Sequence, residues 1–322
     1  MTDSKNTTAP SRAVIPDADR ILPATYVKLV LTAVFWGGTF IAGKITTRHM
    51  GPYSAAFLRF AIASIFLWAA VIRIEGKMPR LAARQMLPCL LLGLTGVFSY
   101  NVCFFKGLRL IEAGRAAIII ANNPIAIALF SALLFRESLT PRRLLGISIS
   151  VFGAVTVISR GDYLHLLGGG VGWGELFILG CVASWVAFTL LGKVFIKEMT
   201  PLSSIFLASA VGALCLLPAA LAEGLAAQAA SIGMPGWASL FYLGFFGTVL
   251  GFVWYYEGIQ AIGPMKAGVF INFVPVSAIL LGFLILGEAI TPSLLLGAAL
   301  VLAGVWLTNT TSGFRKAGRP AH

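Results

Sequence analysis

The chain has 322 residues, of which 58% are hydrophobic and only 11% charged, and its mean hydropathy is +0.90. A soluble domain carries about 25% charged residues, so this composition excludes a protein whose whole surface faces water. The net charge of +12 is spread over tails and loops, without the basic groove or interleaved stacking residues that nucleic-acid binding requires. No nucleic-acid partner is therefore expected.

Ten apolar segments predict an all-α integral membrane protein. A spanning helix needs about 20 apolar residues to cross a hydrocarbon core about 30 Å thick. These segments are too long and too uniformly apolar to be the strands of a barrel. The expected spans, with the lipid bilayer as their solvent, are 26–46, 54–73, 86–107, 116–135, 143–160, 174–196, 203–222, 236–260, 267–286 and 292–309.

Lysine and arginine residues predict the orientation of these spans. Ten crossings place both polar tails, residues 1–25 and 310–322, on the same side of the membrane. If that side is the cytoplasm, 17 of the 24 Lys and Arg lie on the inner side, six on the outer side, and Arg59 within the second span. The positive-inside rule therefore predicts cytoplasmic termini. The first tail lacks the apolar core of a cleavable signal, so the first span is expected to serve as its own signal.

The two halves of the chain repeat each other. When residues 88–158 are compared with 239–309, eighteen of 71 positions are identical, and many of these are glycine or proline. Each half, 26–160 and 172–309, carries five spans, and because five is odd the second half would enter the membrane from the opposite side. Inverted repeats are typical of secondary transporters, whose halves rock about a central site. We therefore expect two inverted five-helix repeats around a central cavity.

Residues shared by the two repeats also predict local structure. Thr140 and Thr291, each followed by proline, suit the N-cap and first turn of a helix. The nearby Glu137 and Glu288 are expected to accept bonds from the free N–H groups of these same helix starts. Small residues seven positions apart share one helix face and allow helices to approach closely in lipid. Such pairs occur in the fifth and tenth spans, at Gly146, Gly153, Gly297 and Gly304.

Prolines in the fourth and ninth spans predict helix kinks. Pro124 and Pro275 each remove one backbone hydrogen bond, and Asn122, Asn123 and Asn272 lie beside them. Amides buried in a bilayer are costly without partners. Two interpretations stay open: the amides repair the kinks and tie helices together, or they contact substrate near the bilayer midplane.

Charged residues within spans are candidates for function, although each has a simpler interpretation. Snorkelling to the interface, or an ion pair, is the favoured interpretation of Arg59, Lys106 and Glu257. Lys44 continues a stripe of aromatic residues along one face of the first span. It is a candidate attractor for a substrate carboxylate.

Aromatic side chains are expected to line the cavity. Trp36 and Trp185 lie mid-helix at matching places in the repeats, where a lipid-facing indole N–H would lack a partner. Trp254 and Tyr255 lie nearer a helix end, so interfacial anchoring is the alternative for them. The complete set of candidate substrate-binding residues is Trp36, Phe40, Lys44, Tyr100, Asn101, Phe104, Asn122, Asn123, Trp185, Phe188, Trp254, Tyr255 and Asn272.

The sequence indicates no catalytic, metal or cofactor site. The histidines, at positions 49, 165 and 322, lie in loops or the tail, and no HExxH or Ser–His–Asp pattern is present. This disfavours an intramembrane enzyme, the function class that we weigh against a transporter. The four cysteines lie within predicted spans without a CxxC pair and are interpreted as small buried hydrophobes.

Several segments resemble the drug/metabolite transporter superfamily, specifically its ten-helix EamA-type permeases. They are FWGGTF at 35–40, FLRF at 57–60, and the long blocks 107–141 and 258–292, which end in ESLTP and EAITP. Within this superfamily the chain is similar to the YddG-type exporters of aromatic amino acids. The resemblance covers almost all of residues 28–309. It implies export of a small molecule through a central cavity, without ATP, across a bacterial inner membrane.

The candidate residues favour an amphipathic cargo. Aromatic faces suit stacking or a cation, and amides suit polar groups, whereas a phosphate would demand a cluster of basic residues. We therefore expect a monomeric exporter of neutral amino acids, aromatic ones included. Efflux of lipophilic cationic drugs is the alternative.

Overall fold

The computed structural model describes residues 18–79, 83–135, 140–164, 171–195 and 199–310. Every regular element in these ranges is helical, and ten helical stretches are long and apolar enough to cross a membrane. The expectation of an all-α protein with ten spans is therefore confirmed.

The ten spans comprise single helices and helices that change type or break on the way through. The second, fifth, sixth, seventh and tenth spans are α2 (Pro52–Glu75), α7 (Pro141–Ile158), α9 (Trp173–Phe195), α10 (Pro201–Ala222) and α16 (Pro292–Thr310), and the first lies within α1 (Ala18–Thr47). The composite spans are α3 (Ala83–Leu92), η1 (Gly93–Ser99) and α4 (Tyr100–Leu110); α5 (Ala113–Ile120) and α6 (Asn123–Phe135); α12 (Gly233–Phe241), η2 (Tyr242–Leu250) and α13 (Gly251–Ile262); and α14 (Pro264–Ile271), α15 (Phe273–Leu281) and η3 (Gly282–Leu286). A short helix, α11 (Leu225–Ser231), precedes the eighth span.

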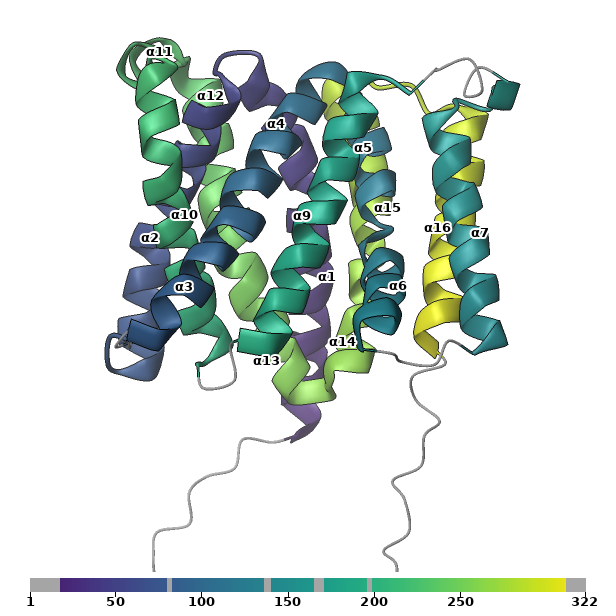
Figure 1. Ribbon diagram of the computed structural model, residues 1–322, viewed down its shortest axis with the longest axis horizontal. Coiled ribbons are helices and arrows are strands. Elements are labelled where there is room, and N and C mark those ends of the chain that lie inside the picture. Colours follow the sequence, from purple (N-terminus) through teal and green to yellow (C-terminus); the bar gives the residue numbers. More distant parts are fainter. Residues whose placement is uncertain (1–17, 80–82, 136–139, 165–170, 196–198, 311–322) are drawn as a thin grey trace, which may run out of the picture.

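The helices form a bundle with two paired ends (Figure 1). In that view α1 and α9 lie in the middle, α2 and α10 at one end, and α7 and α16 at the other. The helix α9 packs against α4 and α6, and α1 packs against α13 and α15. The first residues of α1 and the last of α16 lie on the same side of the bundle, as an even number of crossings requires. The inverted relation of the two halves stays a prediction.

Glycines let α7 and α16 pack backbone to backbone. A methyl group built on Gly304 would lie 2.5 Å from the carbonyl oxygen of Gly146 and 2.5 Å from the backbone nitrogen of Ser150. One built on Gly153 would lie 2.8 Å from the carbonyl oxygen of Gly297. The predicted packing faces of the fifth and tenth spans are thus confirmed.

The threonine caps are confirmed, whereas the predicted role of the glutamate was wrong. The hydroxyls of Thr140 and Thr291 accept hydrogen bonds from backbone N–H groups three residues on, at 3.3 and 3.2 Å. Glu288, however, accepts no bond from α16. Its carboxylate instead accepts from the backbone nitrogens of Ala113 and Gly114 at 2.7 and 3.1 Å, which caps α5. Glu137 lies outside the described residues.

Two further carboxylates, those of Glu75 and Glu223, join the antiparallel helices α2 and α10. Glu223, at the end of α10, accepts from the backbone nitrogen of Ser54 at 2.7 Å in the first turn of α2. Glu75, at the end of α2, accepts from the hydroxyls of Thr200 and Ser203 at the start of α10, the latter at 2.6 Å. Free N–H groups at a helix start favour a negative partner, so each helix supplies a carboxylate to the other's start.

Two of the composite spans break beside their prolines. The helix α5 ends before Asn122, whose backbone nitrogen bonds the carbonyl of Ile119 at 3.2 Å, and α6 resumes around Pro124. In the ninth span Asn272 lies in the same position between α14 and α15, just before Pro275.

We predict that the α7–α16 contact tolerates no added carbon. Gly304→Ala would force a methyl group against backbone atoms that cannot move aside, and overpacking of this kind costs about 1–3 kcal/mol. Thermal unfolding of purified protein in detergent should show a Tm several degrees lower. Gly268→Ala in α14 is the control because nothing lies within 4 Å of its added carbon, so its Tm should stay level or rise. Equal melting temperatures in the two variants would contradict this account of the contact.

Candidate functional site

Five aromatic residues form a continuous row across three helices, which we name the central aromatic cluster. They are Phe40 of α1, Tyr100 and Phe104 of α4, and Trp185 and Phe188 of α9. Successive ring centroids lie 5.4 Å apart for Phe40 and Phe104, 6.1 Å for Phe104 and Tyr100, 5.6 Å for Tyr100 and Trp185, and 5.2 Å for Trp185 and Phe188. The cluster thus joins helices from both repeats of the sequence.

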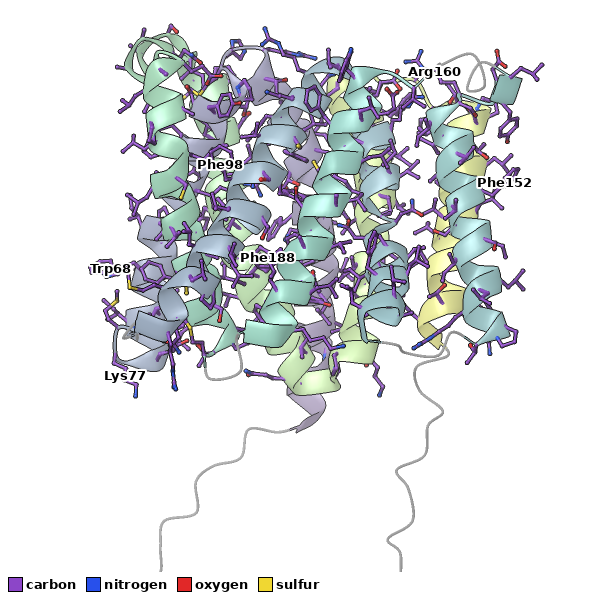
Figure 2. The ribbon with its side chains drawn as sticks, in the orientation of Figure 1. Trp68, Lys77, Phe98, Phe152, Arg160 and Phe188 are labelled. Atoms are coloured by element: carbon purple, nitrogen blue, oxygen red, sulfur yellow. The ribbon has the colours of Figure 1, made fainter. Side chains whose placement is uncertain are left out.

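The rings at one end of the cluster are buried, and those at the other end are partly exposed. Phe40 and Phe104 are buried, with exposed fractions of 4% and 2%, whereas Tyr100, Trp185 and Phe188 are half-buried. Figure 2 labels Phe188 near the middle of the bundle in that view. Its ring rests on η1, where a methyl group on Gly96 would lie 2.3 Å from it. The accessible aromatic faces of the cluster are therefore those contributed by α4 and α9.

The two matching tryptophans have different environments. The indole N–H of Trp36 donates to the carbonyl of Gly247 in η2 at 3.0 Å, and its ring packs on Phe252 and Tyr255 at 5.5 and 5.3 Å. No described residue accepts a hydrogen bond from the indole of Trp185. Trp36 therefore fixes α1 to η2. The indole N–H of Trp185, within the central aromatic cluster, is left without an acceptor among the described residues.

The remaining aromatic candidates, Trp254 and Tyr255, pack against α1 near Trp36 and are not part of the central aromatic cluster. Tyr255 contacts the ring of Trp36, and Trp254 packs on Phe35 at 5.6 Å. Both come from α13, which packs against α1. The structure thus separates the aromatic candidates into the central aromatic cluster and a second group between α1 and α13.

The amide side chains have separate partners. Asn122 donates to the carbonyl of Ile118 at 3.1 Å and accepts from the hydroxyl of Ser150 at 2.7 Å, so it ties the break in the fourth span to α7. Asn123 has a buried side-chain oxygen without a partner. Asn272 is half-buried at the equivalent break. Kink repair is thus the observed arrangement for Asn122, while the oxygen of Asn123 has no such partner.

The expectation for Arg59 was wrong. This side chain neither snorkels nor forms an ion pair with a described residue; it is 8% exposed and donates from Nη1 to the side-chain oxygen of Asn101 at 2.9 Å. A second, longer bond of 3.5 Å runs from Nη2 to the hydroxyl of Thr248. The guanidinium also lies 5.9 Å from the ring centre of Phe104. An uncompensated cation therefore adjoins the buried end of the central aromatic cluster.

Other charged candidates have ordinary partners. Glu257 forms the expected ion pair, at 2.6 Å with Lys28. Lys106 lies over the ring of Tyr53 at 5.2 Å. The ammonium of Lys44, in the last turn of α1, donates to the backbone carbonyl of Ile111 at 2.7 Å.

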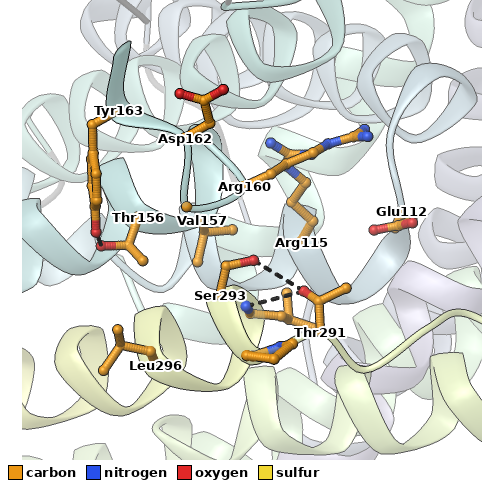
Figure 3. Close-up of a pocket in the computed structure, with 13 residues that line it drawn as sticks. Glu112, Arg115, Thr156, Val157, Arg160, Asp162, Tyr163, Thr291, Ser293 and Leu296 are labelled. Carbon is orange, nitrogen blue, oxygen red and sulfur yellow. Dashed lines mark hydrogen bonds between the residues drawn. The ribbon is translucent and has the colours of Figure 1, made fainter. Parts of the chain in front are cut away.

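A separate pocket of about 760 Å³ lies where α7 ends and where α5 and α16 begin (Figure 3). Arg115 and Arg160 line it together with Glu112 and Asp162, and none of the central aromatic cluster does. Arg115 is buried and lies 3.3 Å from the carboxylate of Glu175. No feature of the sequence pointed to this pocket. Among the described residues no group of His, Cys, Asp and Glu side chains could hold a metal ion.

Comparison with family models decides the class of protein. Residues 24–159 and 172–310 each match the model of the EamA-like transporter family. The chain belongs to this family. The two matched segments begin and end within two residues of the halves 26–160 and 172–309. The resemblance to EamA-type permeases is confirmed.

Three relatives of this EamA family member are named as transporters, exporters or efflux pumps, and this chain aligns with nearly the whole length of each. An uncharacterized transporter, YyaM, of Bacillus subtilis is 29% identical over 87% of this chain and 92% of its own. A probable terminal-alkyne amino-acid exporter of Streptantibioticus cattleyicolor is 27% identical over 91% and 96%. A probable amino-acid metabolite efflux pump of Salmonella typhimurium is 28% identical over 89% and 94%. This EamA protein is therefore a multi-pass membrane transporter and not an enzyme.

A solved structure shares the fold of this EamA protein. It is 21% identical, covers 91% of this chain and 99% of its own, and superimposes with a TM-score of 0.62.

We predict that the two matching tryptophans differ in their effects when each is changed to phenylalanine. Trp36→Phe removes a hydrogen bond to a buried carbonyl and should lower the free energy of unfolding by about 1 kcal/mol. Trp185→Phe removes a donor that no described residue uses, so the Tm should stay level while the KM of transport changes. Thermal unfolding and transport in liposomes measure the two effects. An equal loss of stability in both variants, or an unaltered KM in Trp185→Phe, would show that the assignment is mistaken.

Proposed function

We propose that this EamA transporter exports neutral amphipathic amino acids, aromatic ones included, by alternating access around the central aromatic cluster. The observation that carries the proposal is the cluster itself, which joins α1, α4 and α9 and leaves Tyr100, Trp185 and Phe188 partly exposed. Offset rings at such separations attract one another. An aromatic or aliphatic side chain of a cargo can therefore replace part of this contact.

Two further observations support amino acids as the cargo. Two relatives, 27% and 28% identical, are named as a probable amino-acid exporter and a probable amino-acid metabolite efflux pump. The polar groups at the cluster include the indole of Trp185, the hydroxyl of Tyr100, the amide of Asn101 and the guanidinium of Arg59. This set suits a small molecule with one apolar end and one polar end, and it lacks the basic cluster that a phosphate would need.

The mechanism that we propose uses the two halves, 26–160 and 172–309, as inverted repeats. Gly96 of η1 matches Gly247 of η2 in the sequence repeat. In the present state Trp36 bonds Gly247 while Trp185 is free. In the state open to the other side of the membrane the roles would exchange, with Trp185 bonding Gly96 and Trp36 released. Rocking between two such states is the general device of inverted-repeat transporters.

Export, combined with the proposed orientation in the membrane, defines the side on which the cargo binds and the side on which it leaves. The excess of Lys and Arg supports cytoplasmic termini, and the relative from Salmonella typhimurium supports a bacterial inner membrane. The cargo would then bind from the side of the two termini and leave from the side of the α11 helix. A single chain supplies the whole cluster, so a monomer suffices.

Efflux of lipophilic cations is the competing proposal because aromatic faces also bind cations. The buried charge of Arg59, 5.9 Å from the ring of Phe104, argues against it, since two cations in a low-dielectric site repel each other.

Purified protein in liposomes tests the proposal. Labelled phenylalanine should accumulate faster than in protein-free liposomes, and unlabelled phenylalanine and tryptophan should compete with it. The aromatic contacts predict that Phe188→Ala raises the KM for phenylalanine about tenfold, because one stacking contact and its buried area are lost. Competition by quaternary amines alone, with none by amino acids, would move the assignment to drug efflux.

A further inference from the structure

Arg59 is a buried charge without a counter-charge. It lies seven residues after the start of α2, about 10 Å along the helix at 1.5 Å per residue, and only 8% of it is exposed. A charged side chain at such a depth is costly and is ordinarily paired with another ionised group. An unpaired one therefore requires an explanation.

The partners of Arg59 in the structure are all neutral. Its strong bond goes to the amide of Asn101, its weak one to the hydroxyl of Thr248, and its Nε has no partner. A guanidinium has five N–H donors, so most of its capacity is unused. The carboxylates whose side chains the structure describes lie at helix ends, in loops or in the Lys28 ion pair, at Glu75, Glu112, Asp162, Glu175, Glu223, Glu257 and Glu288.

The orientation of the guanidinium is fixed. Asn101 donates from its own nitrogen to the carbonyl of Val97 at 2.8 Å, which turns its oxygen toward Arg59. The rings of Phe60 and Phe104 lie 5.2 and 5.9 Å from the guanidinium carbon. Three elements, α2, α4 and η2, thus hold one cation in place at the buried end of the central aromatic cluster.

We infer that Arg59 binds the carboxylate of the cargo. The inference rests on the proposed function and narrows the class of substrate. A substrate must carry an acidic group, whereas no residue near the cluster requires an ammonium group. A carboxylate would form charge-assisted bonds in a fork geometry and would replace the long contact with Thr248. Lys44, expected to hold this role, already donates to a backbone carbonyl at the end of α1.

The alternative is that Arg59 only fastens α2 to α4 and η2. That role would lower stability and maximal rate for every substrate when Arg59 is changed. It would not alter the choice between substrates with and without a carboxylate. The discrimination between such substrates is therefore the informative measurement.

The first experiment uses the unaltered protein in liposomes. Uptake of labelled phenylalanine, relative to protein-free liposomes, tests the proposed function by itself. Competition is then measured with 3-phenylpropanoate, which keeps the carboxylate and lacks the ammonium group, and with phenethylamine, which keeps only the ammonium group. We expect 3-phenylpropanoate to compete and phenethylamine to compete at least about tenfold more weakly, the factor that loss of one charge-assisted bond produces. Uptake of phenylalanine with equal competition by both compounds would overturn the role of Arg59 and leave the proposed function standing.

The second experiment changes the residue. Arg59→Gln should raise the KM for phenylalanine at least about tenfold and remove the discrimination against phenethylamine, and Arg59→Lys should recover part of it because the charge is kept. Arg109→Gln, at an exposed site near the end of α4, is the matched control and should behave as the unaltered protein. Unchanged discrimination in a folded Arg59→Gln protein would refute the inference. If that variant does not fold, the competition measured with the unaltered protein decides.

Discussion

The hydrocarbon core offers no hydrogen-bond partner, so the chain must satisfy each of its own backbone groups. The helical spans meet this constraint along their length, and the ends and breaks need additional partners. Glu288 and Glu223 meet it at the starts of α5 and α2, each from a helix or loop distant in sequence. At the break in the fourth span, the side-chain nitrogen of Asn122 donates to the backbone carbonyl of Ile118, and the hydroxyl of Ser150 donates to the oxygen of the same amide. These side chains therefore also connect helices that are distant in the sequence.

Some polar side chains of the described residues lack a full set of partners. The free indole of Trp185 and the buried oxygen of Asn123 lack protein partners among the described residues, and the guanidinium of Arg59 is only partly satisfied. Natural proteins tend to leave such groups unsatisfied where function needs them. The pocket lined by Arg160 also contains a buried arginine, Arg115, but that side chain is already paired with Glu175. Its size alone does not make it the site of transport.

Sequence reasoning was correct where structure depends on local pattern. The ten spans follow from segment length, the caps at Thr140 and Thr291 from their neighbours, and the glycine faces from a spacing of seven. It was wrong about Glu288 and Arg59 because their partners lie on other helices, and no local pattern says which helix faces which. For the same reason it treated the two matching tryptophans alike, whereas one side chain is bonded and the other is free.

The central claim is that cargo lies against the aromatic row of α1, α4 and α9. Photolabelling with p-azidophenylalanine, followed by peptide mapping by mass spectrometry, tests it most directly because the label attaches where the ring binds. We expect attachment around Tyr100, Trp185 or Phe188, suppressed by excess phenylalanine. Attachment confined to the pocket at Tyr163, or to lipid-facing residues such as Trp68 and Phe152, which Figure 2 shows at opposite ends of the bundle, would contradict it.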